Sequence, residues 1–429
     1  MELLLEFLSF SDPNIRFVVL GSVLLTASSA IVGCFTFLKK KALVGDAVAH
    51  SILPGVCLGF LLAGSKNPLY LIVGAFITGW LSLVIIDAIV AKSKIKEDTA
   101  IGLILSVFFG MGILLLTMIQ HSGNAAQSGL DQFLFGKAAA LVGQDLIVFS
   151  IVAVTLIFFV VLFFKEFTLI SFDKDLAIAL GFPVRRIELV LTTLTVLAVV
   201  IGIQAVGVVL MAAILITPAA AARFWTDRVK IMVILAALFG AFSGFAGAFI
   251  SYAAPAMPTG PWIVVVISII AFTSFFFAPK KGILYRTWNQ RKIKRQMVEE
   301  NILKTIYSLG AISKNYFQPK TEQEILAARN FETSQLHLGL NRLKNQGYLK
   351  RSGDQWVLSP EGRDKGQHVV KLHRLWEVYL TKYLRIAPDH VHEDAETIEH
   401  VITPELEVKL EKLLKYPKLD PHESEIPYS

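Results

Sequence analysis

The sequence predicts an all-α polytopic membrane domain of eight or nine transmembrane helices, followed by a cytosolic winged-helix domain and a further helical domain. Two properties of the composition lead to this fold class. The 429 residues are 54% hydrophobic with a mean hydropathy of +0.59, which is too apolar for a soluble protein of this length. The charge is also unevenly distributed: residues 1–279 contain 16 Lys+Arg and 14 Asp+Glu, whereas residues 280–429 contain 25 and 20.

Apolar runs long enough to cross a hydrocarbon core of about 30 Å define the candidate spans. They lie near residues 15–38, 43–64, 68–91, 99–119, 145–165, 187–204, 205–222, 231–253 and 261–279. Gly202, Gln204 and Gly207 interrupt what is otherwise one apolar block, so the number of crossings is eight or nine. A short segment at 131–142 could enter the membrane without crossing it.

The basic residues of the connecting loops predict the orientation of these spans. Alternating crossings place five basic segments on one side, and the positive-inside rule makes that side cytoplasmic. The N-terminus is then outside and the charged C-terminal region is in the cytosol, as expected for a multi-pass protein of the plasma (inner) membrane. The basic segments are 39–41, 92–96, 165–186, 223–230 and 280–281.

One carboxylate and one imidazole fall inside the second apolar run, in LVGDAVAHSILPG. Asp46 and His50 are four residues apart and therefore share one face of a helix, where both could bind a single divalent ion. Oxygen and imidazole donors suit Mn²⁺, Fe²⁺ and Zn²⁺. Ionisable residues inside a membrane are functional candidates by default. The alternatives are that Asp46 caps the helix or pairs with a nearby lysine, and that His50 is a core histidine bonded to a carbonyl.

The most elaborate cytoplasmic loop is FDKDLAIALGFPVRRIE, residues 172–188. It predicts a short amphipathic helix from Asp173 to Leu180, ended by Gly181 and followed by Pro183. Such a helix is either an interfacial anchor or a segment that docks in the groove of a cytosolic ATPase subunit. Its periodicity is compatible with both.

The last 150 residues divide into three parts after the membrane domain of residues 1–281. Residues 282–298 predict a basic juxtamembrane helix or linker that faces anionic lipid headgroups. Residues 299–362 predict a winged helix, with a turn at Asn330–Glu332 between two helices and a hairpin around Gly353. The expected recognition helix is Thr333–Asn345, and such modules bind either DNA or other proteins. Its candidate DNA-contacting residues are Gln335, His337, Asn341, Arg342 and Lys344.

Potential metal ligands cluster in the helical domain of residues 363–429. Glu396, Glu399 and His400 have i, i+3 and i+4 spacing, which places their oxygen and nitrogen donors on one helical face. A solvated acidic face is the alternative interpretation. His373, Glu377 and His392 lie upstream of this set.

Residues 15–280 resemble the ABC-transporter permeases for manganese, zinc and iron. The similar blocks are LVGDAVAHSILPGV, FDKDLAIALGFPVRR, AVGVVLMAAILITPAAAAR and PTGPWIVVV, in the order found in that family. The resemblance implies a homo- or heterodimeric pore, an extracytoplasmic metal-binding protein and separate ATPase subunits. It also implies that Asp46 and His50 line the metal path. The chain contains no GxxxxGK[ST] motif and is expected to be a non-enzymatic subunit without an ATP site. The implied coupling residues are Phe172, Asp173, Asp175, Leu176, Ala179, Gly181 and Pro183.

Residues 295–427 resemble the diphtheria-toxin-repressor family through HRLWE and ExxEH elements. That resemblance implies a metal-sensing dimerisation domain with two groups of ligands, and the glutamate at position 396 resembles the manganese-sensing branch. The sequence departs from the family in the first helix, where Asn301 and Lys304 occupy the positions of two acidic ligands. The implied ligand groups are His373, Glu377 and His392, and Glu396, Glu399 and His400.

These features together predict a permease subunit of an ATP-driven importer of divalent manganese, iron or zinc, with a regulator-like C-terminal domain. The same metal is its substrate and could be its effector. Two alternatives are a membrane-tethered or released metal-dependent repressor, which would bind DNA, and a secondary metal transporter that works without ATP.

Overall fold

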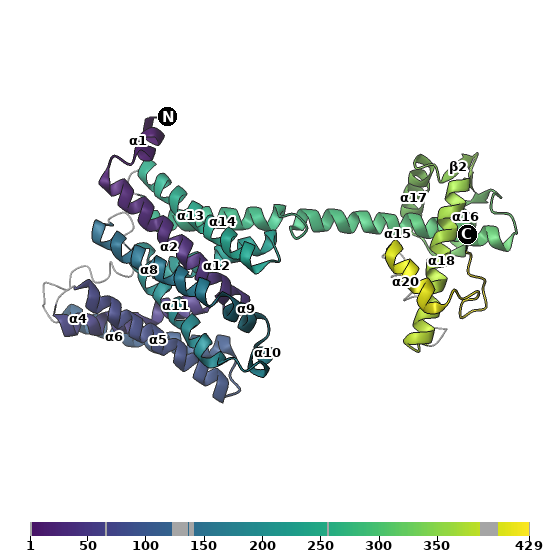
Figure 1. The fold of residues 1–429 in the computed structure, drawn as a ribbon. Helices are drawn as coiled ribbons and strands as arrows, with labels where there is room; N and C mark the ends of the chain where they lie inside the picture. Colours follow the sequence, from purple (N-terminus) through teal and green to yellow (C-terminus); the bar gives the residue numbers. More distant parts are fainter. Residues whose placement is uncertain are drawn as a thin grey trace. The chain divides into compact units, whose positions relative to one another are not determined.

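The computed structural model describes residues 2–64, 67–121, 136, 141–254, 257–386 and 402–428. It divides into two compact units, Met1–Tyr285 and Arg286–Ser429. In its described residues the first unit is helical throughout, and the second combines helices with a three-stranded sheet. Figure 1 shows the elements of each unit.

The first unit contains nine helical segments long and apolar enough to cross a membrane, counted over the described residues. Eight are single helices, and the second span is built from the consecutive helices α3 and α4. The break between the sixth and seventh spans is real, because Gly207 adopts a φ of +88° there. The helices are α2 (Pro13–Leu38), α3 (Val44–Ser51), α4 (Leu53–Ala63), α5 (Pro68–Lys92), α6 (Glu97–His121), α8 (Gly143–Leu162), α11 (Val184–Val206), α12 (Val208–Trp225), α13 (Val229–Ala253) and α14 (Thr259–Phe277).

Helix α2 is the centre of this bundle, in contact with α8, α11, α12 and α13 (Figure 1). Its contact with α13 depends on small residues, because a Cβ added at Gly240 would lie 2.6 Å from the carbonyl oxygen of Thr26. The hydroxyl of Thr26 in turn donates a hydrogen bond of 2.7 Å to the carbonyl of Gly240. Small residues and hydroxyl groups of this kind allow membrane helices to pack closely.

Three short helices complete the described part of the first unit. Helix α1 (Glu2–Ser9) inserts the buried ring of Phe7 among Phe245, Phe249 and Tyr252 of α13. Helices α9 (Phe164–Phe172) and α10 (Lys174–Ala179) form most of the connection between α8 and α11. The segment predicted at 131–142 lies largely outside the described residues.

The second unit has the predicted winged-helix order of elements. A hairpin turns at Gly353, where φ is +62°, and its strands pair antiparallel with Leu349 opposite Leu358. The sheet order is β1-β3-β2. The predicted linker 282–298 and the following helix are one continuous helix, α15. The elements are α15 (Ile283–Ile312), β1 (Lys320–Thr321), α16 (Glu322–Ala328), α17 (Thr333–Asn345), β2 (Leu349–Ser352), β3 (Gln355–Leu358), α18 (Pro360–Tyr383) and α20 (Pro404–Leu414).

Helix α20 packs on α18 through a small apolar core of Leu375, Leu410, Leu414 and Ile426. An ion-pair cluster flanks this core: the Lys371 ammonium lies 2.5 Å from a carboxylate oxygen of Glu407 and 3.1 Å from one of Glu411. Burial alone would lower the pKa of Lys371, but the hydrogen bonds to the two glutamates outweigh burial and raise it. The ammonium therefore stays charged while it ties the two helices together.

Helices α4 and α5 pack so closely at Gly55 that the stability of the fold depends on this glycine. A Cβ added at Gly55 would lie 2.0 Å from the carbonyl oxygen of Gly74, so Gly55→Ala must push the two helices apart. Overpacking of this kind costs about 1–3 kcal/mol. We expect a lower Tm for the full chain in detergent. The matched control is Gly110→Ala on α6, where an added Cβ meets no atom within 4 Å. An equal loss of Tm in both variants would contradict the close packing.

Candidate functional site

Helix α3 places Asp46 and His50 beside each other. Asp46 lies in its first turn and His50 in its last, and the distance from His50 Nε2 to Asp46 Oδ1 is 3.4 Å. The two side chains are 43% and 26% exposed, and six of the other residues of α3 are buried. The pair is therefore the polar, accessible part of an otherwise covered helix.

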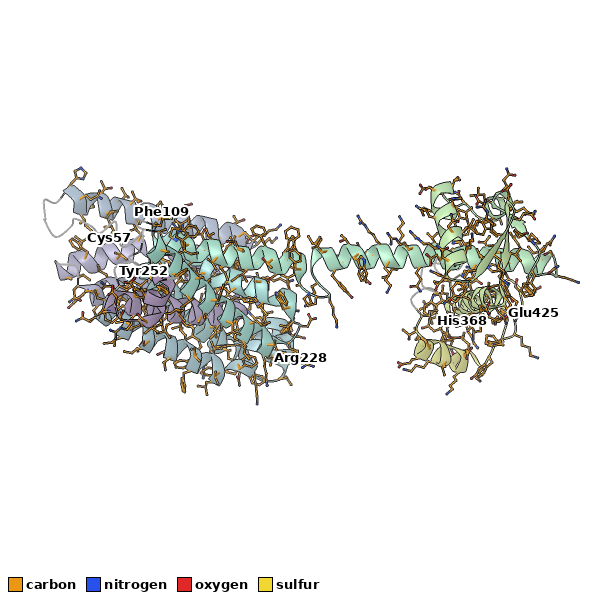
Figure 2. The ribbon with its side chains drawn as sticks, turned by 90° about the horizontal axis from the view of Figure 1, so that it is seen from above. Cys57, Phe109, Arg228, Tyr252, His368 and Glu425 are labelled. Atoms are coloured by element: carbon orange, nitrogen blue, oxygen red, sulfur yellow. The ribbon has the colours of Figure 1, made fainter. Side chains whose placement is uncertain are left out.

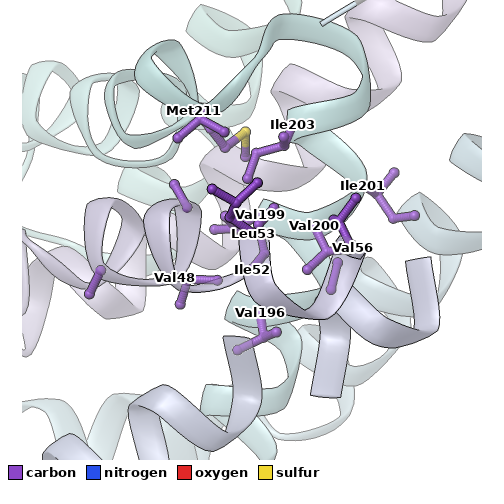
Figure 3. Close-up of a cluster of buried hydrophobic side chains, with 14 of the residues drawn as sticks. Val48, Ile52, Leu53, Val56, Val196, Val199, Val200, Ile201, Ile203 and Met211 are labelled. Carbon is purple, nitrogen blue, oxygen red and sulfur yellow. The ribbon is translucent and has the colours of Figure 1, made fainter. Parts of the chain in front are cut away.

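The buried face of α3 and the start of α4 rest on α11 and α12. Val48 and Ile52 pack with Val196 and Val199 of α11 and with Met211 of α12, and these residues form one cluster in Figure 3. Since residues on opposite faces of a helix cannot both enter the core, this packing turns Asp46 and His50 away from α11.

A ring from α6 covers part of the pair. Phe109, labelled in Figure 2, stands edge-on to the His50 ring, with the centroids 5.4 Å apart and the planes at 88°. Just beyond the pair, α3 ends at Ser51 and α4 begins at Leu53. Pro54 has no N–H to donate to the carbonyl of His50, which explains a helix break at this position.

Two of the three lysines that precede α3 pair with carboxylates other than Asp46. The Lys39 ammonium lies 2.8 Å from Glu188 of α11, and the Lys41 ammonium lies 2.8 Å from Asp87 of α5 and 3.4 Å from Glu97 of α6. Burial alone would lower the pKa of Lys41, but Asp87 and then Glu97 outweigh burial and raise it. Among the described residues, Asp46 is therefore not paired with a lysine, which was one alternative for this side chain.

Glu188 pairs with basic residues that are remote in the sequence. Its nearest basic neighbours along the chain are Arg185 and Arg186. The structure instead places Glu188 between two lysines, Lys39 at 2.8 Å and Lys174 of α10 at 3.1 Å. We call these three side chains the Glu188 junction. It joins the end of α2, the start of α11 and helix α10, and no local spacing in the sequence could have revealed it.

The loop 172–183 exposes apolar side chains around α10. Asp173 caps the helix through a hydrogen bond of 2.8 Å from the backbone N–H of Leu176, and Gly181 ends it with a φ of +80°. Ala177 is buried, whereas Phe172 and Leu176 are 59% and 46% exposed. The expected helix is thus present, one residue shorter at each end. All seven predicted coupling residues, Phe172, Asp173, Asp175, Leu176, Ala179, Gly181 and Pro183, are exposed.

In the second unit, the predicted recognition helix matches α17. Three of its five candidate side chains contact carboxylates of their own unit. Gln335 donates a hydrogen bond of 2.5 Å to Glu332, His337 lies 3.4 Å from Glu322, and Arg342 lies 3.8 Å from Glu299. Asn341 is half-buried and Lys344 is exposed.

The predicted sensor ligands are only partly within the described residues. His373 and Glu377 of α18 are buried, with His373 Nε2 3.1 Å from Glu377 Oε1. The other four, His392, Glu396, Glu399 and His400, lie outside the described residues. Within the described part of the chain, no group of three His, Cys, Asp or Glu side chains could hold a metal ion. On α15, Lys304 is 8% exposed, and the buried Oδ1 of Asn301 has no hydrogen-bond partner among the described residues.

Comparison with known proteins gives two family matches. Residues 11–278 match the ABC 3 transport family. Residues 359–428 match the iron dependent repressor, metal binding and dimerisation domain.

Individual relatives cover most of the chain. The manganese transport system membrane protein MntC of Bacillus subtilis (strain 168) is 41% identical over 381 residues, which are 89% of this chain and 87% of that protein. The zinc transport system membrane protein TroC of Treponema pallidum (strain Nichols) is 42% identical over 284 residues, 66% of this chain and 95% of that protein.

A solved structure agrees with the helical arrangement of the first unit. PsaBC from Streptococcus pneumoniae, in complex with a Fab, has a TM-score of 0.58 and 34% identity, and the match covers 65% of this chain and 97% of that one. The chain therefore belongs to the ABC 3 transport family, and its C-terminal part carries an iron-dependent-repressor metal-binding and dimerisation domain.

Proposed function

We propose that the chain is the permease subunit of an ATP-driven importer of divalent transition metal, with manganese, iron or zinc as its substrate. The observation that carries this proposal is the Asp46–His50 pair on α3, inside a membrane-length segment. The names of the relatives, which refer to manganese and zinc transport, support the choice of substrate class.

The geometry of the pair suits a passing ion. Donors about 2.1 Å from a tetrahedral metal ion lie about 3.4 Å apart, and His50 Nε2 and Asp46 Oδ1 are separated by 3.4 Å. One carboxylate and one imidazole are too few for a closed structural site. They hold an ion weakly enough for it to move on, and water or the other chain of a dimeric pore would supply the remaining ligands.

We further propose that the permease binds partner proteins on both sides of the membrane. By the positive-inside rule, the basic loops favour an N-terminus outside and a second unit in the cytosol of the plasma (inner) membrane. An extracytoplasmic metal-binding protein would deliver the ion to a homo- or heterodimer of permease chains. Cytosolic ATPase subunits would dock on the exposed apolar side chains around α10, where Phe172 and Leu176 are available.

The Glu188 junction provides a route from that docking surface to the metal site. Lys174 at the start of α10 and Lys39 at the end of α2 share the Glu188 carboxylate, and α3 begins five residues after Lys39. Movement of α10 would therefore pull on the loop that holds α3. The junction is partly buried, with Glu188 26% exposed, so its ion pairs are screened less than surface pairs.

For the second unit we propose a metal-responsive regulatory role in preference to a main role as a DNA-binding repressor. Gln335, His337 and Arg342 are engaged by carboxylates, which weakens α17 as a reader of DNA. The buried His373–Glu377 pair would be part of a metal site completed by residues of the 387–401 segment. Lys304, at a position where an acidic ligand is expected, would weaken that site.

Asp46→Ala and His50→Ala test the metal path. Each removes one of two ligands, so we expect uptake of radiolabelled Mn²⁺, Fe²⁺ or Zn²⁺ at limiting concentration to fall at least tenfold at equal expression. Asp98→Ala and His121→Ala, the same residue types at the ends of α6, are matched controls and should leave uptake unchanged. Normal uptake by both α3 variants would refute the site.

Glu188→Gln tests the junction, because glutamine keeps the shape of the side chain but cannot pair with two ammonium groups. In the reconstituted transporter with its ATPase subunits, we expect less metal transported per ATP hydrolysed and unchanged metal affinity. Arg185→Gln, which alters the sequence neighbour, should behave as wild type. Unchanged coupling in Glu188→Gln would show that the junction only stabilises the fold.

The regulatory proposal predicts a second class of metal site in the full chain. In the Asp46→Ala/His50→Ala background, calorimetry of the detergent-solubilised protein should still detect saturable Mn²⁺ binding, and His373→Ala should reduce its affinity at least tenfold. His422→Ala, in the C-terminal tail, serves as the control. If the double variant binds no metal, the second unit is not a sensor.

A further inference from the structure

The second unit contains a large hollow that the proposed transport function does not use. Its volume is about 680 Å³, and it lies between the middle of α15, the end of α17 and the start of α18. Trp288, Arg291, Lys292 and Arg295 line it from α15 with i, i+3, i+4 and i+7 spacing, which is one face of the helix. We call this hollow the α15 cavity.

The charge of the α15 cavity is strongly positive. Five cationic side chains and two carboxylates line it. Both carboxylates have partners there: Glu299 contacts Arg342 at 3.8 Å and Glu300 contacts Lys365 at 3.4 Å. For the remaining cations, Arg291, Lys292 and Arg295, the described residues provide no carboxylate partner within 4.0 Å. Three cations that converge on one hollow without counterions predict an anionic ligand.

The composition of α15 indicates where that ligand comes from. Five residues separate the end of α14 at Phe277 from the start of α15 at Ile283. Trp288 therefore follows the last residue of α14 by only eleven residues of the chain. Leu284, Tyr285 and Trp288 are 50%, 41% and 64% exposed. Exposed aromatic residues beside basic ones are typical of segments at a membrane surface.

We propose that the α15 cavity binds the phosphate of an anionic lipid headgroup. Arg291, Lys292 and Arg295 would bind the phosphate oxygens, and Trp288 would cover the apolar part of the headgroup. Arg342 and Lys365, already held in place by Glu299 and Glu300, connect the bound lipid to α17 and α18. The headgroup would thus tie the second unit to the membrane, in addition to the covalent link.

Hydrogen–deuterium exchange of the full chain in nanodiscs tests this site. We compare phosphatidylcholine alone with discs in which phosphatidylglycerol replaces half of it, and expect several-fold slower exchange of α15 around residues 288–296 in the anionic discs. Lys292→Gln/Arg295→Gln should abolish this protection. Arg286→Gln/Lys294→Gln removes the same charge from α15 but does not alter the cavity lining, so it should keep the protection. Unchanged exchange of the α17 and α18 peptides in phosphatidylcholine discs, where no anionic lipid is bound, confirms that each variant is folded.

Three outcomes would overturn the proposal. The first is equal loss of protection in the two double variants, which would indicate general attraction of a basic helix to an anionic surface. The second is equal protection in phosphatidylcholine discs supplied with glycerol phosphate, which would identify a soluble phosphate ligand. The third is the same protection by duplex DNA, which would assign the cavity to nucleic acid.

Discussion

The first unit depends on how it neutralises charge at the base of α3. Lys39 and Lys41 would be costly beside an apolar helix bundle, and each is paired with a carboxylate of a different helix. Glu188 of α11, Asp87 of α5 and Glu97 of α6 thereby fix the loop from which α3 starts. The pairing leaves Asp46 without a lysine, and the packing of Val48 and Ile52 against α11 turns it to the accessible side. The geometry of the candidate metal site thus follows from ion pairs outside it.

The sequence was sufficient for the parts of the fold that depend on local patterns. Apolar runs located the nine candidate spans that the described residues contain, since a bilayer imposes a minimum length on each. Glycines in turn-forming positions also located the ends of helices and strands. Gly181, Gly207 and Gly353 have positive φ at the end of α10, between α11 and α12, and in the hairpin, where the sequence predicted breaks. The pairing of Asp46 with His50 was also predictable, because i, i+4 spacing on a helix fixes proximity.

Contacts between segments that are far apart in the sequence could not be predicted from local patterns. The pairing of Glu188 with Lys39 and Lys174, rather than with the nearby Arg185 and Arg186, was not predictable, because proximity in sequence does not say which side of a helix faces a neighbour. The α15 cavity was missed because its lining comes from α15, α17 and α18, and only the basic character of residues 282–298 was visible beforehand. Residues 283–298 and the first helix of the winged helix form one continuous helix, α15.

Binding of the transported ion by Asp46 and His50 can be observed by anomalous X-ray scattering at the manganese absorption edge, from crystals of the full chain grown with Mn²⁺. We expect a peak in the membrane unit at about 2.0–2.2 Å from both Asp46 Oδ1 and His50 Nε2. A peak elsewhere between the spans, with none beside this pair, would contradict it.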